Sequence, residues 1–138
     1  MSTLEIYSDG GSRGNPGPAA IGVVILENKE AKAELSEYIG EATNNTAEYT
    51  AVIRALKWVK SNIQDDVEVA FYLDSLLVVE QLNQRYKLKN EGLKPLFWQI
   101  RGLIMDLGGK ITFKHIPREK NKEADRLVNE ALDSHSKK

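Results

Sequence analysis

The sequence predicts a single α/β domain, built on a mixed β-sheet with helices on its faces. Two observations predict this class. Three strand-like segments come first, separated by turns rich in Gly, Pro, Asn and charged residues. Helical and strand-like segments then alternate along the rest of the chain, as they do in sheets whose faces are covered by helices. With 138 residues, of which 41% are hydrophobic, the chain has the size of one domain with one core.

The chain opens with a hairpin that is followed by a third strand. Apolar and β-branched residues predict strands over residues 4–9 and 19–26, and Asp9 ends the first of them. The glycines of the connecting loop leave no side chain between the backbone and a ligand, so a large polymer could lie against it. For Asp9 alone, a solvated turn residue is the simpler interpretation. Residues 31–40 predict a third strand, which is less apolar and therefore near a sheet edge.

The first helix is predicted directly after these strands. Thr43, Asn44 and Asn45 are residue types that cap helices, and apolar residues recur at helical spacing over residues 47–59. Glu48 therefore lies in the first or second turn. The helix dipole favours a carboxylate there without any function, and the two asparagines can act as caps alone.

The strongest strand signal after the opening hairpin covers residues 67–73. These residues are almost all apolar, as expected for a strand that is buried on both faces. The strand ends at Asp74, and Asp74 with Ser75 can cap a short helix that reaches Leu82. Capping is thus an alternative explanation for this acid as well.

A polar segment, a third helix and a fifth strand follow. Residues 84–94 are polar, and Pro95 begins a helix that ends near Leu107, just before two glycines. The apolar stripe of this helix is typical of core packing rather than of a base-stacking surface. Residues 111–116 predict the fifth strand, which carries His115 near its end.

The last predicted helix covers residues 121–132 and has Asp125 in its first turns. Residues 134–138 predict a frayed tail, in which His135 has no role. We therefore expect one domain over residues 1–133.

The composition excludes several classes of function. Cysteine is absent, so the chain has no disulfide framework, no thiolate metal site and no cysteine nucleophile. A signal segment is not recognisable, and no apolar run approaches the roughly 18 residues of a membrane helix, so we expect a soluble cytoplasmic protein without a membrane partner. The net charge is −1, so a nucleic-acid partner would have to be held by local clusters of Lys and Arg.

Four acids stand where strands end or helices begin: Asp9, Glu48, Asp74 and Asp125. Sites in α/β sheets form at such places, so we expect the four to converge at one edge of the sheet. Crowded carboxylates repel one another and raise their own pKa values unless cations neutralise them. Hard oxygen ligands without cysteine suit Mg²⁺ or Mn²⁺. Two such ions ~3.5–4 Å apart can hold the attacking and leaving oxygens of a phosphodiester.

Four motifs of the chain resemble those of type 1 ribonuclease H. They are YSDGGSRGNPG at 7–17, TNNTAE at 43–48, LDS at 73–75, and HIPRE at 115–119 with Asn121 and Asp125. They occur in the order and spacing of that family and span nearly the whole chain. The resemblance implies a metal-dependent endoribonuclease that hydrolyses the RNA strand of RNA/DNA hybrids by a two-metal-ion mechanism and leaves 5′-phosphate and 3′-hydroxyl ends. It also implies a five-stranded mixed sheet in which the second strand is antiparallel to its neighbours.

The resemblance also implies roles for individual residues. The catalytic carboxylates that hold two Mg²⁺ ions, with Mn²⁺ as a substitute, would be Asp9, Glu48, Asp74 and Asp125. His115 would move protons or help the product leave, although a strand-end histidine bonded to backbone is the alternative. The backbone around Gly11 and Ser12 would read the 2′-hydroxyl. Contacts to the hybrid would come from Asn15, Thr43, Asn44 and Asn45, and from a reduced basic patch of Lys87, Lys89 and Lys94.

The chain departs from the family pattern at two positions. Glu41 stands where many members carry an Arg that contacts a DNA-strand phosphate, and Leu76 stands where some carry a polar base contact. The segment 84–94 is too short for the basic protruding helix of some members, so the chain resembles the compact archaeal and bacterial forms. We expect a monomer without an obligatory protein partner.

Two other functions remain open from the sequence. One is a different phosphodiesterase of the same superfamily, such as a junction-cutting or DNA-transposing nuclease, and the close motif match weighs against it. The other is a catalytically inactive module that binds hybrids, and the presence of all four acids weighs against that.

Overall fold

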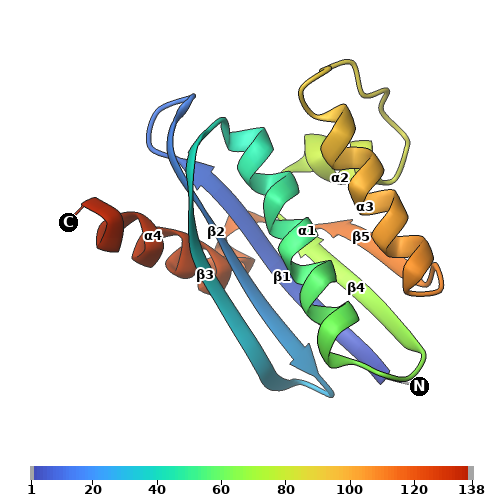
Figure 1. Ribbon diagram of the computed structural model, residues 1–138. Helices are drawn as coiled ribbons and strands as arrows, with labels where there is room; N and C mark the ends of the chain where they lie inside the picture. Colours follow the sequence, from blue (N-terminus) through green and yellow to red (C-terminus); the bar gives the residue numbers. More distant parts are fainter. Residues whose placement is uncertain (1, 137–138) are drawn as a thin grey trace.

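The computed structural model describes residues 2–136 and contains one five-stranded sheet with helices packed on it (Figure 1). The strands are β1 (Ser2–Ser12), β2 (Gly17–Glu27), β3 (Glu30–Ala42), β4 (Val67–Leu73) and β5 (Ile111–His115). The helices are α1 (Asn44–Asn62), α2 (Leu76–Leu82), α3 (Lys94–Asp106) and α4 (Lys122–Ser136), and a short 3₁₀ turn, Arg118–Lys120, precedes α4. Among the described residues, no helix combines the length and the apolar character that a membrane span requires.

The sheet is mixed and has the strand order β3-β2-β1-β4-β5. β2 is antiparallel to both of its neighbours, whereas β1, β4 and β5 run parallel to one another. The predicted five-stranded mixed sheet with an antiparallel second strand is therefore confirmed. β3 is an edge strand with many exposed side chains, as its polar sequence predicted.

Helices cover both faces of the sheet. α1 and α3 lie side by side on one face, where the largest apolar cluster includes residues of β1, β2, β4 and α1 (Figure 1). α4 packs on the other face, where Ala20 of β2 is buried with Val128 and Leu132. Gly22 allows this close approach, because a Cβ there would collide with the carbonyl oxygen of Ala124.

The first strand is longer than we predicted. We expected it to end at Asp9, and this is wrong: β1 continues to Ser12, which pairs with Ala19 of β2. On its other side β1 loses its partner earlier, because the last pair with β4 is Tyr7 with Tyr72. Asp9 thus stands inside a strand, at the point where only one of the two neighbouring strands continues.

The last helix also extends beyond its predicted end at residue 132, because α4 continues to Ser136. The ring of His135 stacks on Tyr38 of β3 with ring centroids 3.7 Å apart, and this contact holds the last turn against the sheet edge. Residues 134–136 of the expected frayed tail are therefore helical, while residues 137–138 lie outside the described part of the chain.

Candidate metal centre

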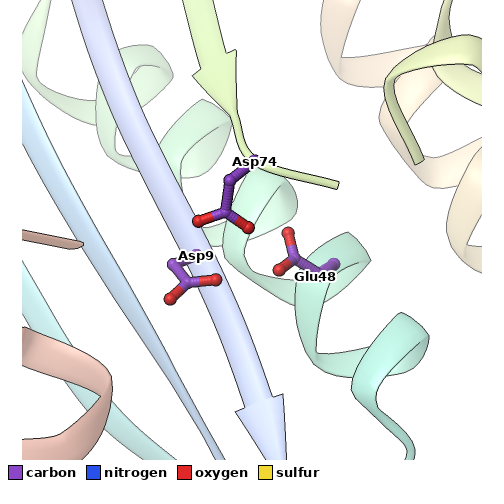
Figure 2. Close-up of side chains that lie close together, drawn as sticks. All are labelled: Asp9, Glu48 and Asp74. Atoms are coloured by element: carbon purple, nitrogen blue, oxygen red, sulfur yellow. The ribbon is translucent and has the colours of Figure 1, made fainter. Parts of the chain in front are cut away.

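Three of the four predicted acids lie together beside the sheet. Asp9 comes from β1, Glu48 from the second turn of α1, and Asp74 from the residue that follows β4 (Figure 2). One carboxylate oxygen from each lies within 4.8 Å of the others. Asp9 and Glu48 are both 5% exposed, and Asp74 is half-buried. Such a group of oxygen ligands can hold a metal ion.

The fold explains why these acids meet. Asp9 and Asp74 each stand two residues beyond the last pair of β1 with β4, so the parallel register brings them to the same level. Gly10 lets α1 approach β1, because a Cβ at this residue would collide with the backbone of Ala47. The Gly10 N–H then donates a hydrogen bond to Glu48 Oε1 at 3.3 Å. The Glu48 carboxylate of α1 therefore contacts β1 directly beside Asp9.

The fourth acid lies near this cluster but outside its closest group. Asp125 is half-buried in the first turn of α4, and its charge contributes to raising the pKa of Asp9. Its Oδ2 atom accepts a long hydrogen bond of 3.4 Å from Asn129 Nδ2, one turn further along the helix. Asp125 thus borders the site from α4, on which it lies.

Burial dominates the electrostatics of the site. It raises the pKa of Glu48 well above its ordinary value, and the charge of Asp9 adds to this effect. It also raises the pKa of Asp9 to about 6; the charges of Asp74 and Asp125 act in the same direction, whereas a hydrogen bond with Glu48 and the charge of Arg118 oppose the shift. Without a bound cation, the site therefore holds a proton more tightly than isolated carboxylates do.

The residues fit a hard divalent cation. Glu48 Oε2 is buried and has no hydrogen-bond partner within the described part of the chain. A buried carboxylate oxygen without a partner carries a large desolvation cost, which a coordinated cation would remove. An open pocket of about 310 Å³ borders the cluster and leaves room for a ligand; it is lined by Gly10, Asn44, Asn45, Glu48, Asp74, Ser75 and Arg118.

Arg118 is a site residue that sequence reasoning missed. It lies in the 3₁₀ turn before α4, lines the same pocket, and its charge lowers the pKa of Asp9. A cation beside a pocket formed by acids can attract a phosphate that would otherwise be repelled. The signal for it was its place in the motif that begins at His115.

The predicted contacts to a hybrid surround the N-terminus of α1. Asn44 Oδ1 accepts hydrogen bonds from the Ser12 N–H at 2.9 Å and from Ser12 Oγ at 3.2 Å. Asn15 Oδ1 accepts one from the Asn44 N–H at 3.0 Å. Thr43 Oγ1 accepts one from the Thr46 N–H at 3.1 Å, which confirms that it caps α1. The bonds of Ser12 and Asn15 tie the glycine-rich segment, residues 10–17, to the N-terminus of α1.

The remaining predicted residues are dispersed. His115 is exposed at the end of β5. It pairs in register with Leu73 of β4, the residue directly before Asp74. Lys87 and Lys89 are exposed in the segment between α2 and α3. The third member of the predicted patch, Lys94, is half-buried and forms an ion pair of 2.7 Å with Glu91, which offsets its charge. Glu41 is exposed at the end of β3, and Leu76 is 49% exposed at the start of α2.

The chain matches one protein family over most of its length and is similar to several known proteins. Residues 7–131 match the family described as reverse transcriptase-like. The chain is 41% identical to a bifunctional protein of Mycobacterium tuberculosis over 95% of its length, but it covers only 36% of that protein. It is 41% identical to ribonuclease HI of Halobacterium salinarum, over 94% of the chain and 64% of that protein. It is 34% identical to ribonuclease H of Erythrobacter litoralis, over 99% of the chain and 100% of that protein. The chain thus spans about a third of the length of the first of these relatives.

Solved structures of the same kind superpose closely. LC11-RNase H1, isolated from compost by a metagenomic approach, has a TM-score of 0.92 and 49% identity, over 98% of this chain and 99% of that one. The same enzyme in complex with an RNA/DNA hybrid has a TM-score of 0.91, over 96% of this chain and 98% of that one. Sequence motifs, sheet topology and these relatives agree, and the chain belongs to the type 1 ribonuclease H family.

Proposed function

We propose that this protein is a metal-dependent endoribonuclease that hydrolyses the RNA strand of RNA/DNA hybrids by a two-metal-ion mechanism. The products would carry 5′-phosphate and 3′-hydroxyl ends. The observation that carries this proposal is the convergence of Asp9, Glu48 and Asp74 within 4.8 Å in a chain with this fold. The 49% identity to an enzyme solved with an RNA/DNA hybrid supports the choice of substrate.

In this proposal four carboxylates hold the metal ions. Asp9, Glu48 and Asp74 would be ligands, and Asp125 would complete the set from α4. Mg²⁺ would be the natural ion and Mn²⁺ its substitute, because all the donors are hard oxygens. When bound, the ions supply an activated water and neutralise charge on the phosphodiester. The protein itself holds the carboxylates apart from bulk water, since Asp9 and Glu48 are almost fully buried.

The other residues of the site would act on the substrate directly. Arg118 would draw the scissile phosphate into the pocket that it lines. Ser12 is fixed by two hydrogen bonds to Asn44, so the backbone beside it at Gly11 is held in place to test the 2′-hydroxyl of the ribose. Thr43, Asn15 and Asn45 would contact the hybrid at the start of α1.

His115 would transfer protons or assist product release from its exposed position at the strand end. His115→Ala should lower kcat by roughly 10- to 10⁴-fold and leave Mg²⁺ affinity unchanged, because the side chain is not a ligand. Single-turnover and steady-state rates on saturating hybrid measure this effect. Unchanged turnover would rule out the role.

One digestion experiment separates the proposed activity from its alternatives. The purified protein is incubated with Mg²⁺ and an end-labelled RNA/DNA hybrid, a DNA duplex or an RNA duplex. The proposal is supported if the protein cuts the RNA strand of the hybrid and cuts neither its DNA strand nor the two duplexes. Cutting of the DNA duplex would favour another nuclease of the superfamily, and tight binding without cutting would favour an inactive module. We further propose that the protein is a cytoplasmic monomer and that residues 1–133 form its catalytic domain. Sedimentation measures whether the protein is a monomer.

A further inference from the structure

One buried side chain connects the elements that carry the carboxylates. Asn121 lies between the 3₁₀ turn and α4, and it is only 1% exposed. Its Nδ2 atom donates one hydrogen bond to the carbonyl oxygen of Ser8 at 2.9 Å and another to Asp74 Oδ2 at 3.1 Å. Both amide protons are therefore used, one on β1 next to Asp9 and one on the acid that follows β4.

The backbone of the same residue reaches two further parts of the site. Its carbonyl oxygen accepts the Asp125 N–H at 3.1 Å, within the turn that begins α4. Its own N–H donates to the carbonyl oxygen of Arg118 at 2.9 Å. Asn121 is thus bonded to Asp74, to the residue before Asp9, and to the turns that carry Asp125 and Arg118.

The orientation of the amide follows from its partners. Asp74 Oδ2 and the Ser8 carbonyl are both acceptors, so only the NH₂ side of the amide can face them. Asn121 Oδ1 then points elsewhere, and this buried atom has no hydrogen-bond partner within residues 2–136. Leaving a buried amide oxygen unpaired costs free energy. The hydrogen bond to the Ser8 carbonyl contributes to the stability of the fold, and the donation to Asp74 is the bond that connects this side chain to the carboxylates.

We propose that Asn121 is a positioning residue that fixes the carboxylate of Asp74 for metal binding. Without this bond, Asp74 is half-buried beside two other acids, and repulsion favours its rotation toward solvent. With the bond, Asp74 Oδ2 is held at the amide of Asn121, and the other oxygen is left for a cation. The inference rests on the proposed function, because it assumes that the carboxylates bind metal.

The test compares Mg²⁺ binding by the parent protein and by Asn121→Ala, measured by isothermal titration calorimetry. Loss of an outer partner of a metal ligand typically weakens affinity by about 10- to 100-fold, and we expect a loss of this size. The control is Asn83→Ala. Asn83 Nδ2 also donates to a partly buried backbone carbonyl, that of Phe113 at 2.9 Å, but this asparagine bonds to none of the carboxylates. Both variants should melt lower without metal, but only Asn121→Ala should bind Mg²⁺ more weakly.

A double-mutant cycle then tests whether the effect passes through Asp74. In an Asp74→Ala background, adding Asn121→Ala should change Mg²⁺ affinity little, because the oxygen that accepts the Asn121 hydrogen bond is already gone. The Mg²⁺ concentration for half-maximal cleavage should rise in Asn121→Ala while KM for the hybrid stays constant. A merely structural residue would not produce this split. If Asn121→Ala does not fold, Asn121→Gln keeps the amide but moves it by one methylene, and it should also weaken Mg²⁺ binding.

The outcomes separate this inference from the function on which it rests. Parent-like Mg²⁺ affinity in a folded Asn121 variant, or an equal loss in Asn83→Ala, would overturn the positioning role and leave the metal site intact. Additive effects in the cycle would overturn the route through Asp74. Failure of the parent itself to bind Mg²⁺ or Mn²⁺ would instead overturn the proposed metal site.

Discussion

At the scale of single residues, the site is a group of acids held together against their own repulsion. Asp9 and Glu48 are buried within reach of Asp74, and Glu48 Oε2 has no partner among the described residues. In the absence of metal this arrangement costs stability, which the rest of the fold must offset.

Asp9→Asn should nearly abolish cleavage, because it removes a metal ligand, and it should leave the fold intact. Without metal, the melting temperature of the variant should equal or exceed that of the parent. The increase should be on the order of 3 °C for each kcal/mol of relieved repulsion. Added Mg²⁺ should stabilise the parent more than the variant. Calorimetric melting with and without Mg²⁺ measures this, and a clearly lower melting temperature in the metal-free variant would contradict the crowded-acid interpretation.

The stability of the metal-free protein should depend on the proton at Asp9. The pKa of this acid is raised from 3.8 to about 6, so the folded state binds a proton that the unfolded state releases. Its contribution is complete below pH 3.8 and is lost as the pH rises through about 6. Between pH 4 and 7, the free energy of unfolding measured in urea should therefore fall more in the parent than in Asp9→Asn. If the two proteins showed the same pH dependence of this free energy, Asp9 would not titrate in this range.

At the scale of elements, two neighbouring glycines have different tasks. Gly10 lies under α1, and a Cβ there would collide with the backbone of Ala47. A Cβ at Gly11 would meet only ordinary contacts, with Val128 Cγ1 at 3.7 Å and Asn44 Oδ1 at 4.0 Å. Gly10 thus serves helix packing, whereas Gly11, near the end of β1, leaves the surface of the glycine-rich segment open to a ligand.

Gly10→Ala should destabilise the protein by about 1–3 kcal/mol or more, because α1 must move away from β1. Gly11→Ala should change stability by less than about 0.5 kcal/mol. Gly11→Val should keep the fold but slow cleavage at ribonucleotides even with saturating substrate, because the branched side chain holds the sugar away. Urea denaturation and cutting of a hybrid with a short ribonucleotide block measure both effects. If Gly11→Val lost only affinity, the glycine-rich segment would not read the sugar.

At the scale of the whole molecule, binding of a polyanion must rely on local charge, since the net charge is −1. Lys87 and Lys89 are exposed between α2 and α3, while Glu91 offsets the charge of Lys94. Phosphate contacts by such lysines release counterions and carry no information about the sugar. Affinity and strand choice should therefore reside in different parts of the molecule.

Replacing Lys87 and Lys89 by alanine should weaken hybrid binding and reduce the slope of log affinity against log salt by about 1.8 at most, at roughly 0.9 per phosphate contact. Lys94→Ala should have a smaller effect because of its ion pair with Glu91. Strand choice should not change in any of these variants. Binding titrations at several salt concentrations, together with mapping of cut positions, test this; cutting at deoxyribonucleotides by the lysine variant would refute the separation.

Much of this fold is encoded locally. β4 and α2 cover the residues that the sequence predicted, because apolar runs and caps are properties of short segments. The approach of Glu48 and Asp74 was also predictable, since Glu48 lies near the start of a helix and Asp74 follows a strand, whereas Asp9 joins them from inside β1. Their roles as ligands remain a prediction.

The tertiary structure decided what depends on neighbours far away in the chain. β1 passes Asp9 because β2 continues to pair with it, and the last turn of α4 contacts Tyr38 of the distant strand β3 through His135. The raised pKa of Asp9 and the bridge made by Asn121 arise from burial and contacts between distant segments. Propensity and periodicity belong to a segment, but strand ends, desolvation and hydrogen-bond partners are set by what packs against it.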